Sequence, residues 1–76
     1  MKIWIDADAC PKAIKEHIFK TSQRLNIPVV LVANSNMKIP SSPLFSIVVV
    51  EKNPDEADKF ILQNAQIGDI AISADI

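Results

Sequence analysis

The chain has 76 residues, of which 49% are hydrophobic and 22% charged, so it is long enough for one small globular domain. A formal net charge of −1 excludes an overall basic field, so any binding of polynucleotide must depend on local lysines or on a bound metal ion. The single cysteine excludes an internal disulfide framework and predicts a cytoplasmic protein. No apolar run approaches the ~20 residues that a membrane-spanning helix needs.

The first half of the chain predicts a strand, a helix and a second strand. Residues 2–6 are apolar and β-prone, which indicates a buried strand. Pro11 suits the first position of a helix over residues 11–25, with an apolar stripe of Ile14, Ile18 and Leu25. Residues 28–34 are uncharged and rich in β-branched side chains, so they predict a second buried strand. Prolines, asparagines and serines over residues 34–43 indicate a loop.

The second half repeats the alternation. Residues 45–50 predict a third strand and residues 69–74 a fourth. Between them, Asn53 and Glu56 have the spacing of a capping box at the start of a helix over residues 54–66. Pro54 would take the first helical position, and Gly68 would close the helix in the left-handed conformation.

This order of elements predicts a three-layer α/β fold with a doubly wound, mainly parallel four-stranded sheet. The strand order 3-2-1-4 is expected because it places a switch point between the first and fourth strands, with one helix on each face. One helix per face cannot cover four strands. We therefore expect either a homo-oligomer or, as the favoured interpretation, that residues 1–76 are the N-terminal part of a longer single domain.

Acidic residues follow two of the predicted strands. Asp6 and Asp8 come at the end of the first strand, where side chains two apart point the same way, and Asp75 ends the fourth. Ligands of open parallel sheets bind beyond the carboxyl ends of the strands, at the switch point. We therefore expect these three carboxylates to converge.

The second helix adds two more acids. At about 100° per residue, Asp58 falls inside the apolar arc of that helix, with Leu62 on the same arc, and Asp55 lies on its margin. A carboxylate on a buried arc needs a partner. Simpler roles exist for most of the acids: Asp8 as a cap of the first helix, Asp55 as a charge at a helix dipole and Asp75 as a turn residue. Glu51 and Asp69 are predicted to be solvated boundary residues.

The acids together predict a divalent-metal site. Two like charges ~4 Å apart repel by about 4 kcal/mol at an effective dielectric constant of about 20, so a shared site requires a cation or raised pKa values. No arginine or histidine stands in a matching position. Carboxylate oxygens without His or Cys ligands select Mg²⁺ or Mn²⁺. The candidate ligands are Asp6, Asp8, Asp55, Asp58 and Asp75.

Such a site is suited to hydrolysis of a phosphodiester, with RNA as the expected substrate. The candidate catalytic residues are Asp6, Asp8, Asp58 and Asp75. Three lysines could contact the phosphate backbone of the substrate, namely Lys12, Lys15 and Lys38, and Asn34 could orient a water or a phosphate. The alternatives are solvated surface lysines and, for Asn34, the initiation of a turn.

Four segments carry a resemblance to a known family. WIDADACP at residues 4–11, LVAN at 31–34, DEAD at 55–58 and GDIAISADI at 68–76 resemble the YaiI/YqxD family of bacterial proteins, which belongs to the PIN-like (PIN/NYN) domains. The resemblance implies a PIN-like fold and metal-dependent ribonuclease activity. By position, it implies metal binding by Asp6 with Asp8, by Asp58 with Asp55, and by Asp75. Family members continue past the ADI segment with further helices, a fifth strand and a basic region.

Three other interpretations remain open at this stage. Asp6 and Asp8 have the spacing of the nucleophile and the acid–base residue of haloacid-dehalogenase-like phosphatases, although Cys10 stands where that motif has Thr or Val. Cys10 itself precedes Pro11 at a helix N-terminus, where the helix dipole can lower a thiol pKa, so a redox or nucleophilic role is one interpretation. The alternative is that Cys10 packs as a small apolar side chain. Finally, an uncovered edge such as residues 45–50 would suit a non-enzymatic module that binds a partner, which predicts a dimer without metal dependence.

Overall fold

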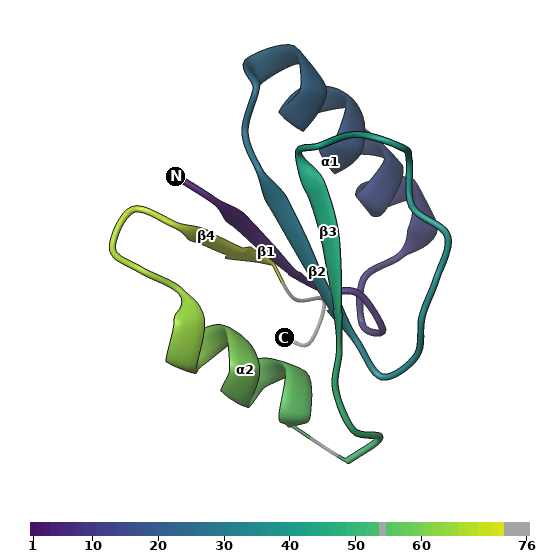
Figure 1. The fold of residues 1–76 in the computed structure, drawn as a ribbon, viewed down its shortest axis with the longest axis vertical. Helices are drawn as coiled ribbons and strands as arrows, with labels where there is room; N and C mark the ends of the chain where they lie inside the picture. Colours follow the sequence, from purple (N-terminus) through teal and green to yellow (C-terminus); the bar gives the residue numbers. More distant parts are fainter. Residues whose placement is uncertain (54, 73–76) are drawn as a thin grey trace.

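The computed structural model describes residues 1–53 and 55–72 (Figure 1). Within them the chain forms the strands β1 (Ile3–Asp6), β2 (Val29–Ala33), β3 (Phe45–Val49) and β4 (Ile70–Ile72), and the helices α1 (Lys12–Leu25) and α2 (Glu56–Asn64). The sheet has the order β3-β2-β1-β4 and all its pairs are parallel. The predicted α/β fold and strand order are confirmed. Neither described helix is both long and apolar enough to cross a membrane.

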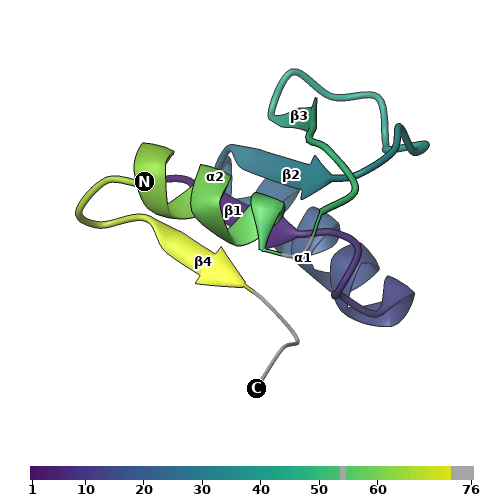
Figure 2. The same ribbon diagram turned by 90° about the horizontal axis from the view of Figure 1, so that it is seen from below.

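The two helices cover opposite faces of the sheet, so the domain has three layers (Figures 1 and 2). Side chains of β1 alternate between these faces, as the pleat of a strand requires. Ile3 and Ile5 pack in the cluster that contains Ile18 of α1, whereas Trp4 packs with Ile61 of α2. The central strand β2 is buried along its whole length, which explains its uninterrupted apolar sequence.

Helix α1 buries a different stripe from the predicted one. Ile18 is buried as expected, but Ile14 is 46% and Leu25 55% exposed. Phe19 and Ser22 lie against the sheet instead, with the Phe19 ring centroid 4.7 Å from that of Phe45. The buried face of α1 is therefore shifted from the predicted one toward Phe19, which packs on Phe45.

Helix α2 begins differently from the prediction. Its N-terminal flanking residue is Asp55, whose left-handed backbone (φ 69°) is one that aspartate tolerates, and no side chain among the described residues caps the helix. The predicted capping box is wrong, because the Asn53 amide donates to the Glu51 carboxylate (3.2 Å) rather than reaching the helix. The expected role of Pro54 lies outside the described residues.

The end of α2 is also earlier than expected. The helix stops at Asn64, and Ala65 is already extended. Gly68 does have a positive φ of 96°, but it serves the turn that leads into β4 rather than the helix.

Asp69 is an anchor for β4 and not a solvated boundary residue. Its carboxylate accepts hydrogen bonds from the backbone N–H of Lys2 (3.0 Å), the indole N–H of Trp4 (3.0 Å) and the backbone N–H of Gln66 (2.9 Å). The bond from Gln66 and then that from Trp4 hold the pKa of Asp69 below its ordinary value. The carboxylate thus connects the turn before β4 to the start of β1, the strand with which β4 pairs.

We expect the Asp69→Asn variant to unfold more easily than the native protein at neutral pH, because the amide is a weaker acceptor and presents a donor to these N–H groups. The lowered folded-state pKa gives stability that is fully present above the ordinary value of 3.8 and is lost as the pH falls through the folded value. In urea titrations, the difference between the two proteins should therefore shrink in acid. A difference that is absent, or equal at all pH values, would contradict this role for Asp69.

Ser22 offers a second test of the packing. Its side chain is fully buried against the sheet, and its Oγ has no hydrogen-bond partner among the described residues. We expect Ser22→Ala to raise the free energy of unfolding by about 1 kcal/mol, since it removes a buried hydroxyl without a partner and improves helix propensity. Thr21→Ala in the same helix is the control for propensity alone. A less stable Ser22→Ala protein would show that the hydroxyl does form a bond.

Candidate metal centre

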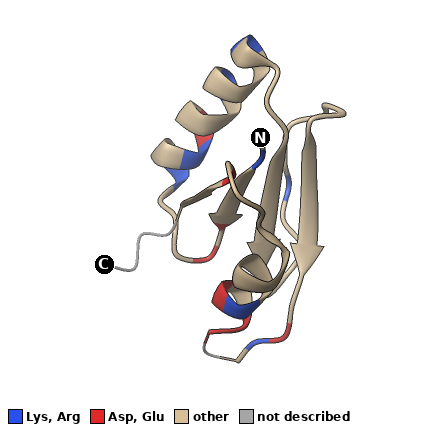
Figure 3. Cartoon of the chain, turned by 90° about the vertical axis from the view of Figure 1, so that its left-hand side faces the viewer, with Lys and Arg blue, Asp and Glu red and all other residues tan. Residues whose placement is uncertain are grey.

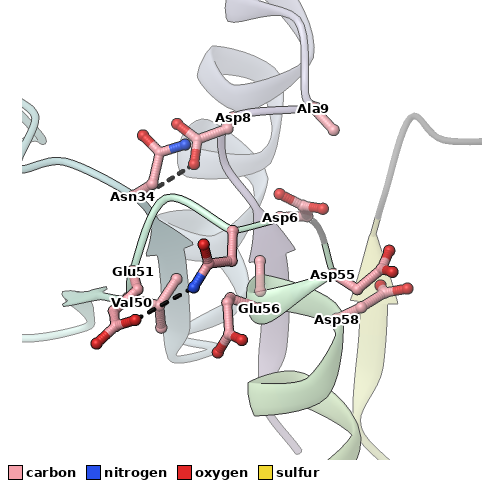
Figure 4. A pocket seen from close by; sticks show the side chains of 11 residues that line it. Asp6, Asp8, Ala9, Asn34, Val50, Glu51, Asp55, Glu56 and Asp58 are labelled. Atoms are coloured by element: carbon pink, nitrogen blue, oxygen red, sulfur yellow. Dashed lines mark hydrogen bonds between the residues drawn. The ribbon is translucent and has the colours of Figure 1, made fainter.

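A cavity of about 210 Å³ opens at the carboxyl ends of β1, β2 and β3, facing the start of α2 (Figure 4). Among the described residues, six acids line it, together with the amides of two asparagines, and no lysine, arginine or histidine belongs to this part of its lining. We call it the acidic pocket. Its acids are Asp6, Asp8, Glu51, Asp55, Glu56 and Asp58, and its amides are those of Asn34 and Asn53.

The topology explains why these residues meet. Parallel strands all end at the same edge of a sheet, so the residues that follow them are neighbours there. Asp6 is the last residue of β1, Asn34 follows β2, and Glu51 lies two residues beyond β3. The connection from β3 then enters α2 beside the same edge, which adds Asp55 and Asp58.

Four of the five predicted metal ligands therefore line one pocket: Asp6, Asp8, Asp55 and Asp58. The fifth, Asp75, lies outside the described residues. In the view of Figure 4, Asp8 lies beside Asn34 on one side, Asp55 and Asp58 lie together on the other, and Asp6 stands between them. Within residues 1–53 and 55–72, no three His, Cys, Asp or Glu side chains are close enough together to hold a metal ion.

Asp8 has a defined structural partner. Its Oδ2 accepts a hydrogen bond of 2.7 Å from the backbone N–H of Asn34, which joins the loop after β1 to the end of β2 (Figure 4). The alternative role of Asp8 as a cap of α1 is wrong, because Pro11 occupies the N-terminal flanking position and no capping side chain is found among the described residues. This bond fixes the backbone at the place where the strands present their acids.

Asp58 is exposed, and the expectation that it lies on a buried arc is wrong. The prediction counted Leu62 as part of the buried face, but Leu62 is 80% exposed. The face that packs on the sheet is formed by Ile61 with Phe60 and Ala57. This shift moves Asp58 to the margin of the helix, from where it lines the pocket without needing a buried partner.

The pocket also contains acids that sequence analysis did not select. Glu51 was predicted to be a solvated boundary residue, and Glu56 was assigned to the capping box, yet both line the pocket. The signal was present for Glu51, since it follows a predicted strand just as Asp8 does. Glu56 lies 3.8 Å from the exposed Lys59 ammonium, a surface pair that contributes little stability.

The predicted substrate-binding lysines lie elsewhere. Lys12, Lys15 and Lys38 all line a second cavity of about 320 Å³, beside α1 and the loop after β2. Of the four residues proposed to contact the substrate, which are these three lysines and Asn34, Asn34 alone is among the described residues that line the acidic pocket.

Cys10 is a packing residue. It is buried in the cluster between the sheet and α1, and this burial is the main cause that raises its thiol pKa. The charge of Lys15 opposes the shift and that of Asp6 adds to it. A neutral buried thiol is neither a nucleophile nor a metal ligand, so the structure favours the apolar role of this residue.

With this geometry in view, the comparisons with known proteins identify the family. The family model described as "Uncharacterized BCR, YaiI/YqxD family" matches residues 4–76. The chain belongs to the YaiI/YqxD family. A UPF0178 protein of Trichlorobacter lovleyi is 53% identical over 76 residues, which are 100% of this chain and 49% of that protein. A UPF0178 protein of Maridesulfovibrio salexigens is 49% identical over all of this chain and 50% of its own length.

A third UPF0178 protein, from Legionella pneumophila, is 49% identical over the whole chain and 51% of its own length. The chain thus spans about half the length of the curated YaiI/YqxD relatives that it matches. No solved structure gives a significant match.

A pair of neutralising variants separates the two roles of the acidic residues. We expect Asp8→Asn to lower the free energy of unfolding by about 1 kcal/mol, because a charge-assisted bond becomes a neutral one. Asp55→Asn removes the same charge from the same pocket and keeps a side chain suited to a left-handed backbone, so it should leave stability unchanged or slightly higher. Denaturant titration without divalent ions measures both. Equal effects of the two variants would show that the Asp8 bond adds nothing.

Proposed function

We propose that the acidic pocket binds Mg²⁺ or Mn²⁺ and that the chain carries the metal-binding part of a phosphodiester hydrolase acting on RNA. The observation that supports this most is the convergence of six carboxylates on one pocket, with no basic residue among the described residues that line it. Because its relatives are about twice as long, the activity is proposed for a protein of that length.

The donor chemistry supports these ions. The described lining offers carboxylate and amide oxygens and no imidazole or thiolate, which is the set that Mg²⁺ and Mn²⁺ prefer. Mg²⁺ usually keeps several of its waters. Carboxylates too far apart to share a bare ion can therefore act on its water shell. Binding through the waters of the ion suits a pocket in which the described acids stand apart from one another.

The mutual repulsion of the carboxylates favours a bound cation, but the repulsion energy is moderate. Asp8, Asp55 and Asp58 are exposed, so their repulsion is closer to the value in water, about 1 kcal/mol for charges 4 Å apart, than to the several kcal/mol of a buried pair. The pocket can therefore form without an ion. A phosphodiester, however, carries the same sign of charge and would be repelled unless a cation lay between it and the carboxylates.

The size of the pocket fits the same chemistry. At about 210 Å³ it is below the range of about 300–1,000 Å³ that is usual for organic ligands, but it can receive a hydrated ion and one phosphate group. A divalent ion bound there would polarise the phosphate and activate water. The residues of this chain would hold the ion and orient its waters, with the Asp8–Asn34 bond keeping one side of the pocket in place.

The hydrolytic step is proposed for RNA on the basis of the resemblance to PIN-like domains. The rival proposal, a phosphatase with Asp6 as nucleophile, would form an aspartyl-phosphate. Hydrolysis by metal-activated water would leave no such adduct. The two reactions are therefore distinguishable by mass spectrometry of the protein after exposure to a phosphorylated substrate.

Calorimetric titration with MnCl₂ tests the metal site. We expect binding that weakens at least tenfold in Asp6→Asn and in Asp58→Asn, since each removes a charge from the pocket. The exposed Glu16 lies outside the acidic pocket, so Glu16→Gln is the matched control and should bind as the native protein does. No heat and no thermal shift at millimolar Mn²⁺ or Mg²⁺ would contradict the proposal, as would equal weakening by Glu16→Gln.

A further inference from the structure

The second cavity differs from the first in both size and chemistry. It has a volume of about 320 Å³ and lies between α1 and the loop that follows β2. Its lining has an apolar part, which we call the floor, and a charged part, which we call the rim and which holds three lysines and one glutamate in a chain whose net charge is −1. We call it the lysine cavity. The floor consists of Phe19, Leu31, Met37, Ile39 and Pro40, and the rim of Lys12, Lys15, Glu16 and Lys38.

We propose that the lysine cavity binds one nucleotide of a single-stranded polynucleotide, with the base against the apolar floor and its phosphate on the lysine rim. The volume falls inside the range of about 300–1,000 Å³ that is usual for small organic ligands. Phe19 and Met37 offer an aromatic ring and a polarisable thioether, on which any base can lie. Lysine ammonium groups are point-charge partners for phosphate.

Two segments of chain lead from one cavity to the other. Asp8 and Asn34 line the acidic pocket, and the segments that follow them, through Lys12 and Lys38, line the lysine cavity. The hydrogen bond from Asn34 to Asp8 holds these segments together. The Lys15 ammonium also donates to the backbone carbonyl of Ala7 (3.4 Å), which keeps that charge close to the end of β1.

The two signs of charge are unevenly distributed over the chain. In Figure 3 blue predominates on α1, with one red segment among it, and red predominates at the start of α2 and on the connection before it, with blue segments among it. If one strand bound in both cavities at once, a base in the lysine cavity would hold that strand while a linkage elsewhere in it lay at the acidic pocket. This part of the inference rests on the proposed function, whereas nucleotide binding in the lysine cavity does not require a metal.

The cavity favours single strands over duplexes. A base can lie on the floor only if it is unstacked and unpaired, as in loops and ends of RNA. In a duplex the bases are covered and only phosphates are available. We therefore expect recognition of a base together with its phosphate, not of phosphate alone.

A nuclear magnetic resonance titration with adenosine monophosphate in the presence of EDTA tests the inference without any divalent ion. We expect shifts of amides in residues 12–19 and 37–40, and weaker binding of both adenosine and inorganic phosphate than of the nucleotide. Lys12→Glu and Lys38→Glu should each weaken binding of the nucleotide by about fivefold, the usual size of a partly screened charge contact. Lys20→Glu, an exposed lysine of α1 outside the cavity, is the matched control and should have no effect.

The outcomes of this titration are separate from those of the metal titration. Shifts in residues 12–19 and 37–40 without any Mn²⁺ binding would support the lysine cavity and reject the metal site. The inference is overturned if inorganic phosphate binds as tightly as the nucleotide, or if Lys20→Glu weakens binding as much as Lys38→Glu. It is also overturned if the shifts lie elsewhere, or if no shift occurs with a 10-fold excess of nucleotide at millimolar concentration. Amide spectra of each variant report directly whether it is folded.

Discussion

The parallel pairing of β1 with β2, and of β2 with β3, is the constraint on which the rest of the structure depends. It turns the ends of three strands toward one edge, so that distant chain segments become neighbours there, such as those of Asp8 and Asn34, which are 26 residues apart. The pairing is stabilised by apolar burial, since β2 is inaccessible on both faces and Ile5 and Leu31 are fully buried. The acidic pocket forms as a consequence of this sheet and contributes little to its stability.

Two carboxylates fix the ends of the sheet in different ways. Asp69, at the amino end of β4, gathers three N–H donors and secures the edge strand against β1. Asp8, at the carboxyl end of β1, takes one donor from the connection after β2. Three of these four bonds satisfy backbone N–H groups. Asp8 also lines the pocket, so the same residue can support the backbone and contribute to the charge of the site.

The parallel α/β sheet could be predicted because apolar, uncharged runs such as that of β2 alternate with helical segments. The alternation does not fix the strand order, which was expected from the switch point that it creates, and the ends of the strands then gave the location of Asp6 and Asp8. Other features depend on tertiary contacts. The three donors to Asp69 come from residues 2, 4 and 66, a combination that no local pattern contains. The exposure of Asp58 was missed because the predicted apolar arc included Leu62, which is exposed in the structure. The lysine cavity could not be predicted because its lining depends on the course of the loop after β2.

The most direct test of the central claim is to locate a paramagnetic ion on the folded chain. Amide spectra recorded with substoichiometric Mn²⁺ show which backbone groups lie near the ion, whatever the activity of the protein. The account predicts selective broadening of residues 6–9, 34, 50–53 and 55–58, which border the acidic pocket, while residues 20–27 and 66–70 keep their intensity. Broadening centred on Asp69, or uniform loss of intensity across the chain, would contradict the claim that the strand ends build a site for a hard cation.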